Sequence, residues 1–228
     1  MSLTFFKRTE KKYMLDESTY RRFRSLVGDR LTEDNFSRSL VCSTYLDTPD
    51  FLLIRNSIDA VDYKEKLRLR TYGTTANTAF LELKKKYRGT VFKRRVELPY
   101  SLALSYVFGK SAPPDSQIMR EIDYAMKLYR NPLPVCLLTY EREAYRLRDS
   151  GVRITFDRRV RYRMSEPLIT MGTHGKQILD DGRVLMEIKS DGALPLWLAH
   201  LLSLEHIFPS GYSKYGTAYM DYLKENKK

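Results

Sequence analysis

Two stretches of the sequence carry positive charge at every second position. Residues 63–73 read YKEKLRLRTYG, and residues 80–86 read FLELKKK. Successive side chains of a β-strand point to opposite faces, so most of these charges share one face and leucines fill the other. An ordinary half-buried sheet with its charged face in water explains either stretch taken alone.

The same alternation continues in further predicted strands, and their charged faces are nearly all Lys and Arg with a few Glu. A solvated face usually mixes in Ser, Thr, Asn and Gln. We therefore predict an α+β fold, a closed antiparallel β barrel of about seven or eight strands that is polar inside and flanked by helices outside. Like charges across a narrow lumen need an anionic guest. A chain of phosphates fits, because its oxygens accept charge-assisted hydrogen bonds from Lys and Arg. These further strands cover residues 92–98, 140–146, 153–157 and 185–189.

The overall charge agrees with an anionic partner. The chain has 40 Lys and Arg against 28 Asp and Glu, a formal net charge of +12. This excess favours nucleic acid, an anionic membrane or a phosphorylated ligand. We expect a single domain over residues 1–228, because the sequence has no Gly/Ser-rich linker, repeat or low-complexity tract.

Cysteine content and hydropathy indicate the compartment. Two cysteines and three histidines give neither a zinc cluster nor a disulfide framework, which favours a reducing cytosol. The N-terminus lacks the apolar run of a signal peptide, and the longest apolar stretch, at 194–204, predicts a core helix. We expect a cytoplasmic protein. If it works at a membrane, a membrane-protein partner for anchoring or export must hold it there.

Caps and turn residues delimit the remaining predicted elements. Tyr87-Arg88-Gly89 predicts the turn of one hairpin, and Asp149-Ser150-Gly151 predicts the turn of a second. Helices are predicted over 16–28, 115–130, 194–207 and 214–225, with a helix or turn at 51–58, and strands over 39–48, 61–72, 79–87, 90–98 and 183–190.

Missing motifs narrow the chemistry. The sequence has no phosphate-binding loop, no dinucleotide-binding glycine motif and no support for a Ser-His-Asp or Cys-His nucleophile. Phosphoryl transfer needs mainly positioning and electrostatic stabilisation, so a cage of cations with one metal suffices. We place Mg²⁺ or Mn²⁺ on Glu187, whose strand is short of other anions and which alternates with Lys189. Asp157 is expected to pair with a neighbouring Arg, and assistance to the metal is the alternative.

Several segments, in this order, resemble the vacuolar transporter chaperone (VTC) family. The resemblance is to its polyphosphate polymerase domain, one of the triphosphate tunnel metalloenzymes, which include the CYTH phosphatases. The segments are RTEKKY at 8–13, STYLDTPDFLLIRNS at 43–57, YKEKLRLRTYG at 63–73, FLELKKKYRGTVFKRR at 80–95, YEREAYR at 140–146, RITFD at 153–157, LMEIK at 185–189 and SKY at 213–215.

The resemblance implies an eight-stranded tunnel that adds the γ-phosphate of ATP to inorganic polyphosphate, with Glu187 holding Mn²⁺ or Mg²⁺. ATP and polyphosphate are the expected partners, and nucleic acid is not expected. Together with the charged faces, it predicts catalytic roles for Lys12, Arg68, Arg70, Lys84, Arg142, Arg153, Lys189 and Lys214. Substrate-binding roles are predicted for Glu10, Arg55, Lys66, Lys86, Lys93 and Arg95.

Two departures from the family pattern bear on the activity. Arg8 stands where the phosphatase branch has its first Glu, and losing a carboxylate weakens a two-metal hydrolytic site. Arg55 is the nearest arginine to Ser57, where eukaryotic polymerases have one. The pattern favours a polymerase. A tunnel triphosphatase and a non-catalytic polyphosphate-binding protein remain the alternatives.

Overall fold

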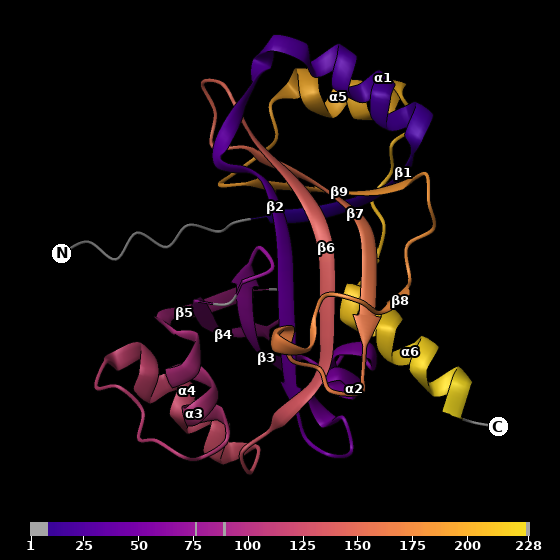
Figure 1. Cartoon of the computed structure of the whole chain (residues 1–228). Helices are drawn as coiled ribbons and strands as arrows, with labels where there is room; N and C mark the ends of the chain where they lie inside the picture. Colours follow the sequence, from indigo (N-terminus) through magenta and orange to yellow (C-terminus); the bar gives the residue numbers. More distant parts are fainter. Residues whose placement is uncertain (1–8, 76, 89, 227–228) are drawn as a thin grey trace. The chain divides into compact units, whose positions relative to one another are not determined.

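The computed structural model describes residues 9–75, 77–88 and 90–226 (Figure 1). Arg8 and Gly89, which entered the sequence predictions, lie outside the described residues. The strands are β1 (Thr9–Asp16), β2 (Leu31–Asp47), β3 (Tyr63–Tyr72), β4 (Thr78–Tyr87), β5 (Thr90–Pro99), β6 (Leu133–Leu147), β7 (Arg153–Arg163), β8 (Lys176–Gln177) and β9 (Arg183–Ser190). The helices are α1 (Glu17–Val27), α2 (Leu52–Ile58), α3 (Tyr100–Val107), α4 (Gln117–Leu128), α5 (Leu196–Leu204) and α6 (Lys214–Asn226).

The strands form a nine-stranded sheet with the order β1-β9-β7-β6-β2-β3-β4-β5, and β8 pairs with β7 beside this path. The register of β1 with β9, of β7 with β9, and of β2 through β5 is antiparallel. The predicted α+β class with an antiparallel sheet is therefore confirmed. In the part of the chain described, β1 and β5 are the two ends of the strand order. Closure into an eight-stranded barrel stays a prediction.

The chain divides into two compact units, which we describe separately. The prediction of a single domain over residues 1–228 stays a prediction. The first unit holds residues 1–39, 140–160 and 179–213, and the second holds 40–139, 161–178 and 214–228.

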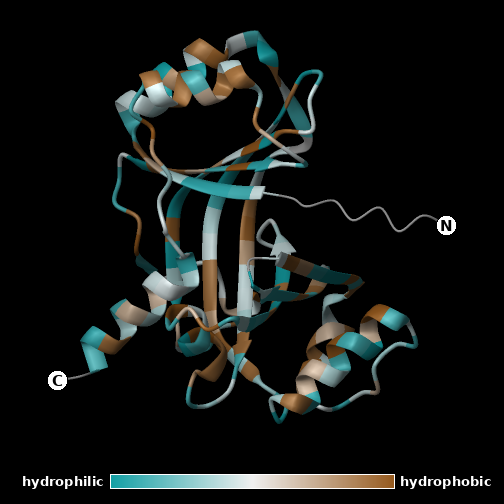
Figure 2. Ribbon diagram, turned by 180° about the vertical axis from the view of Figure 1, so that it is seen from behind, coloured by the Kyte–Doolittle hydropathy of each residue, from teal (hydrophilic) through white to brown (hydrophobic). Residues whose placement is uncertain are grey.

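In the second unit, β3, β4 and β5 form a meander whose apolar face is covered by helices. Leu67, Leu69, Leu81 and Leu83 are buried on this face. They belong to one hydrophobic cluster with residues of α3 and α4, such as Ile122. Figure 2 shows hydrophobic and hydrophilic segments following one another along the strands. The predicted apolar face under helices is present here, which leaves the charged side chains on the other face.

The first unit has its own core, built where β1, β9 and β7 pair. Tyr13, Phe156 and Met186 come from these three strands and are buried together with Phe23 of α1 and Leu198 of α5. Helices α1 and α5 lie side by side in this unit (Figure 1). Asp16 caps α1, because its carboxylate accepts a hydrogen bond from the Thr19 N–H at 2.7 Å.

Most predicted elements are present, and three strands or helices were missed. The helix predicted at 115–130 is α4, capped by Ser116, whose Oγ accepts from the Met119 N–H at 3.1 Å. Strands β1 and β8 and helix α3 were not predicted, and β2 begins eight residues before the predicted start at Ser39. Among the described residues, no helix is both long and apolar enough to cross a membrane.

Candidate functional site

The meander of the second unit aligns its cations in rows. Lys66 pairs with Lys84 across β3 and β4, and Lys84 pairs with Lys93 across β4 and β5. The next row is formed by Arg68, Glu82 and Arg95. Directly opposed residues of an antiparallel pair point to the same face, so both rows lie on one side of the meander. Arg70 shares this face. We call this set the meander cluster; it consists of Lys66, Arg68, Arg70, Glu82, Lys84, Lys93 and Arg95.

Glu82 is the carboxylate at the centre of the meander cluster, and it is 1% exposed. Its Oε2 lies 2.6 Å from the Arg68 guanidinium, and its Oε1 lies 2.6 Å from Lys93 Nζ and 3.3 Å from Arg95 Nε. Burial alone would raise the pKa of Glu82, but the surrounding charges, led by Arg68, hold it well below its usual value. Glu82 is therefore an internal counter-ion that holds three cations in place.

The same environment acts on Lys93. Burial lowers the pKa of the Lys93 ammonium to about 8, with further lowering by Arg68 and Arg70, while Glu82 opposes the shift. The charge of Lys93 thus changes within the range of ordinary assay conditions. Any anion that binds beside it favours the protonated form.

Polar partners on β2 orient the two arginines of β3. Arg68 donates to the Tyr45 hydroxyl at 3.2 Å, and Arg70 Nε donates to Ser43 Oγ at 3.2 Å. Tyr45 stacks on Tyr215, with ring centroids 4.3 Å apart. Ser43 and Tyr45 are two residues apart in the predicted strand 39–48, so their side chains share a face. This spacing is the sequence signal for their supporting role.

The first unit carries a second group of charges on β1, β9 and β7. Glu10, Lys189 and Arg153 are aligned across the three strands. In the next row, Lys12 pairs with Glu187, and Glu187 with Thr155. Arg142 of β6 belongs with these charged residues. We call this set the terminal-strand cluster; it consists of Glu10, Lys12, Arg142, Arg153, Glu187 and Lys189.

Arg142 of the terminal-strand cluster forms a bidentate ion pair. Its Nε and Nη2 donate to the two carboxylate oxygens of Asp157, both at 2.6 Å. Asp157 is fully buried. Burial would lower the pKa of Arg142, but the charge of Asp157 outweighs it and raises the pKa well above its usual value. The expected pairing of Asp157 with a neighbouring Arg is confirmed.

Glu187 lies farther from Arg142 than Asp157 does. Its Oε2 lies 3.6 Å from Arg142 Nη2 and 3.7 Å from Lys189 Nζ, beyond hydrogen-bond distance. Burial lowers the pKa of Lys189, and Arg142 and Arg153 lower it further, while Glu187 and Glu10 oppose them. The sequence analysis did not identify Asp34, whose carboxylate accepts a hydrogen bond from Arg153 Nε at 2.7 Å. No predicted strand covered Asp34, so no pattern pointed to it.

The surroundings of Glu187 fit a divalent metal that takes most of its ligands from phosphates and water. Within the described ranges, no group of three or more His, Cys, Asp or Glu side chains is placed to hold a metal. The Oγ1 of Thr155, opposite Glu187 in register, is buried and has no hydrogen-bond partner among the residues that the structure describes. Mg²⁺ commonly binds through one or two carboxylates plus substrate phosphates. Glu187 would supply the carboxylate, and Thr155 a neutral oxygen.

Three predicted site residues, Arg55, Lys86 and Lys214, lie outside the two clusters, and Lys12 has a backbone partner. Arg55 of α2 forms an exposed ion pair with Asp50. Lys86 is exposed near the end of β4, and Lys214 is buried at the first turn of α6. Lys12, in the terminal-strand cluster, donates from Nζ to the Tyr212 carbonyl at 3.0 Å.

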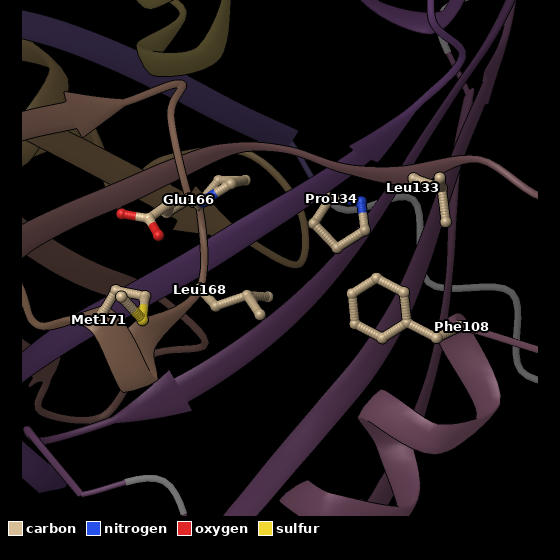
Figure 3. Close-up of a pocket in the computed structure, with 7 residues that line it drawn as sticks. Phe108, Leu133, Pro134, Glu166, Leu168 and Met171 are labelled. Carbon is tan, nitrogen blue, oxygen red and sulfur yellow. The ribbon is translucent and has the colours of Figure 1, made fainter. Parts of the chain in front are cut away.

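The second unit has a pocket of about 320 Å³, and no residue of either cluster lines it (Figure 3). Its lining is apolar apart from Glu166, so it offers no cation to a phosphate. It contains none of the predicted site residues. The lining residues are Phe108, Leu133, Pro134, Glu166, Pro167, Leu168 and Met171.

Comparison with solved structures finds the same fold in distant proteins. A Bacillus halodurans protein described as a candidate adenylate cyclase is 13% identical, with a TM-score of 0.56 over 91% of this chain and 95% of that one. A Vibrio parahaemolyticus protein with the same description is 11% identical, with a TM-score of 0.50 over 93% and 97%. At these identities the likeness shows a shared fold alone.

A comparison with curated proteins finds no match. A family model described as the VTC domain matches residues 7–222. This span includes both clusters and almost the whole chain. The protein therefore belongs to the VTC domain family.

Proposed function

We propose that the protein is a metal-dependent polyphosphate polymerase. It transfers the γ-phosphate of ATP to a growing inorganic polyphosphate chain and releases ADP. The bond between the γ-phosphorus and the β,γ-bridging oxygen breaks, and a new bond to the terminal oxygen of the chain forms. The closed eight-stranded tunnel, the cytoplasmic location and a membrane-protein partner for anchoring or export belong to this proposal.

The observation that carries the proposal is the pair of cation clusters in a chain of the VTC domain family. Each cluster gathers Lys and Arg side chains on one face of paired strands. Such a surface suits a ligand with many phosphate oxygens, because each guanidinium or ammonium donates charge-assisted hydrogen bonds. It offers nothing comparable to a neutral substrate.

The side chains of the two clusters have distinct roles in the proposed reaction. The meander cluster binds phosphates and neutralises the charge that develops on the transferred group, chiefly through Arg68 and Arg70. In the terminal-strand cluster, Arg142 is oriented by Asp157 and donates to phosphate oxygens. Glu187 holds Mn²⁺ or Mg²⁺, and the metal, when bound, neutralises charge on the phosphates. Lys189, beside Glu187, adds a further cation.

The test is incubation of the purified protein with ATP and Mn²⁺, with ADP, free phosphate and polymer all measured in one reaction. We expect polymer in an amount that matches ADP, and its loss in Glu187→Gln. Free phosphate without polymer would replace the proposal by a triphosphatase. Tight polyphosphate binding without turnover would leave a non-catalytic binding protein.

The matched control is Glu141→Gln. Glu141 also lies on a strand of the first unit, but it is half exposed and pairs with the exposed Arg159 at 3.1 Å. We expect this variant to keep wild-type turnover. If it lost activity as Glu187→Gln does, charge removal in general, and not the metal role of Glu187, would account for the loss.

A further inference from the structure

Two aromatic side chains share the charged face of the meander. Tyr72 is on the same face of β3 as Arg68 and Arg70, and Phe80 is on the same face of β4 as Glu82. Their ring centroids are 5.8 Å apart in an edge-to-face arrangement. Tyr72 is 37% exposed at the end of its strand. An aromatic pair thus ends a face that is otherwise charged.

Arg95 connects this aromatic pair to the meander cluster. Its guanidinium carbon lies 3.5 Å from the centroid of the Phe80 ring, so the guanidinium packs on the ring. It also donates from Nη2 to the Tyr72 hydroxyl at 3.2 Å, and its Nε lies 3.3 Å from Glu82. An aromatic ring and a guanidinium plane are both surfaces on which nucleobases stack.

The spacing along β3 matches an extended nucleotide. Strands rise about 3.3 Å per residue, so Tyr72 and Arg68 are separated by roughly 13 Å, and Tyr72 and Lys66 by roughly 20 Å. A nucleoside triphosphate with its base at Tyr72 would therefore place its phosphates among Arg70, Arg68 and the following lysines. Inorganic triphosphate would bind the same cations and leave the aromatic pair unused.

We propose that Tyr72, Phe80 and Arg95 form a nucleobase-stacking site. It orients a nucleoside triphosphate with its base at the Tyr72 end of β3 and its terminal phosphate toward Lys66 and Lys84. This inference rests on the proposed function and adds a direction to it, because the growing phosphate chain then lies on the Lys66 side. Stacking tolerates any base, so GTP and CTP bind there as ATP does.

The experiment measures the dissociation constants of ATP and of inorganic triphosphate by calorimetry at fixed salt, for the wild type and Tyr72→Ala. We expect ATP binding to weaken about tenfold in the variant, because a stacking surface is lost. Triphosphate binding should change less than twofold. Tyr72→Phe removes the hydroxyl that accepts from Arg95 but keeps the ring, and it should bind ATP like the wild type.

The chain offers a matched control pair on the opposite face of the same strands. Tyr87 is 46% exposed, its ring lies 6.4 Å from that of Tyr63, and Arg88 packs on it at 5.3 Å. Tyr87→Ala therefore removes a similar ring, beside a similar arginine, away from the meander cluster. We expect it to bind both ligands like the wild type. If Tyr72→Ala does not fold, Tyr72→Leu keeps the bulk without the ring and should show the same selective loss.

The outcomes separate this inference from the proposed function. Equal weakening of both ligands in Tyr72→Ala would mean that the ring only supports Arg95, and unchanged binding of both would mean that no base stacks there. Either result overturns the stacking site alone. A wild-type protein that binds neither ATP nor triphosphate would overturn the proposed function, and the stacking site with it.

Discussion

The two cation clusters each contain a buried carboxylate, and the two carboxylates are held differently. Glu82 in the meander cluster lies within 2.6–3.3 Å of three cations. Glu187 in the terminal-strand cluster lies 3.6 Å from Arg142 and 3.7 Å from Lys189. The difference arises because Asp157 takes the bidentate contact with Arg142. In the terminal-strand cluster the closest contacts with Arg142 are therefore made by Asp157, whereas in the meander cluster Glu82 itself makes the close contacts.

Asp157→Asn should have the largest effect, and it tests the basis of the comparison. Asparagine gives the Arg142 guanidinium, which is 10% exposed, one acceptor oxygen in place of the two of the carboxylate. Breaking a buried ion pair in this way costs about 4 kcal/mol of the free energy of unfolding. Chemical denaturation of the variant and the wild type would measure the loss. A change below about 1 kcal/mol would mean that Glu187 compensates and that the two acids are interchangeable.

Glu187→Gln should have the second largest effect. We expect it to change metal binding and not stability. We expect Mn²⁺ affinity in the presence of triphosphate to fall about 100-fold or more, because the carboxylate ligand is lost. Titration of Mn²⁺ followed by electron paramagnetic resonance would measure it. Glu82→Gln is the comparison variant, and its Mn²⁺ affinity should stay within a few-fold of the wild type. The reverse pattern would place the metal in the meander cluster.

Glu82→Gln should instead lower stability by about 2 kcal/mol, less than a fully buried pair because its cations are partly exposed. The pH dependence gives a sharper test. The folded-state pKa of Glu82 is lowered, so its stabilisation is present above the unfolded pKa of about 4.3 and is lost as the pH falls below it. Thermal unfolding between pH 6 and pH 3 should therefore change less steeply in the variant. Identical slopes would show that Glu82 does not stabilise the fold as an ion.

Lys93 should give the smallest effect. Its pKa of about 8 means that it is charged below this pH and neutral above it. Triphosphate binding should weaken by up to roughly tenfold between pH 7 and pH 9. Lys93→Arg, which stays charged, provides the reference that removes the titration of the ligand itself. Parallel pH profiles for the two proteins would contradict a role for the Lys93 charge in binding.

The sequence predicted which face of each strand carries charge, because alternation is a local property of an extended chain. Arg68, Lys84 and Lys189 were placed on charged faces in this way. Which carboxylate is tightly held was not predictable, because it depends on register. Glu82 meets Arg95 through the pairing of β4 with β5, and Glu187 meets Lys12 through the pairing of β9 with β1.

Missed elements have similar physical reasons. Strand β1 is short and carries three consecutive charges, so it shows no regular alternation at its start. The first half of β2, which contains Asp34, is mostly polar and carries no apolar period. Their strand conformation comes from pairing with partners far along the chain, which local propensity does not contain.

The pairing of β1 with β9 joins residues from opposite ends of the chain. Thr9 is aligned with Ser190, and the Thr9 hydroxyl donates to the Ser190 carbonyl across 181 positions of sequence. The β3–β4–β5 meander needs only neighbours in sequence, and local pairings form faster than distant ones. During synthesis, the meander cluster can assemble early. The strand pairs that hold Glu187 and Lys189 form only when the ribosome has made most of the chain, so a truncated product would carry the first cluster without the second.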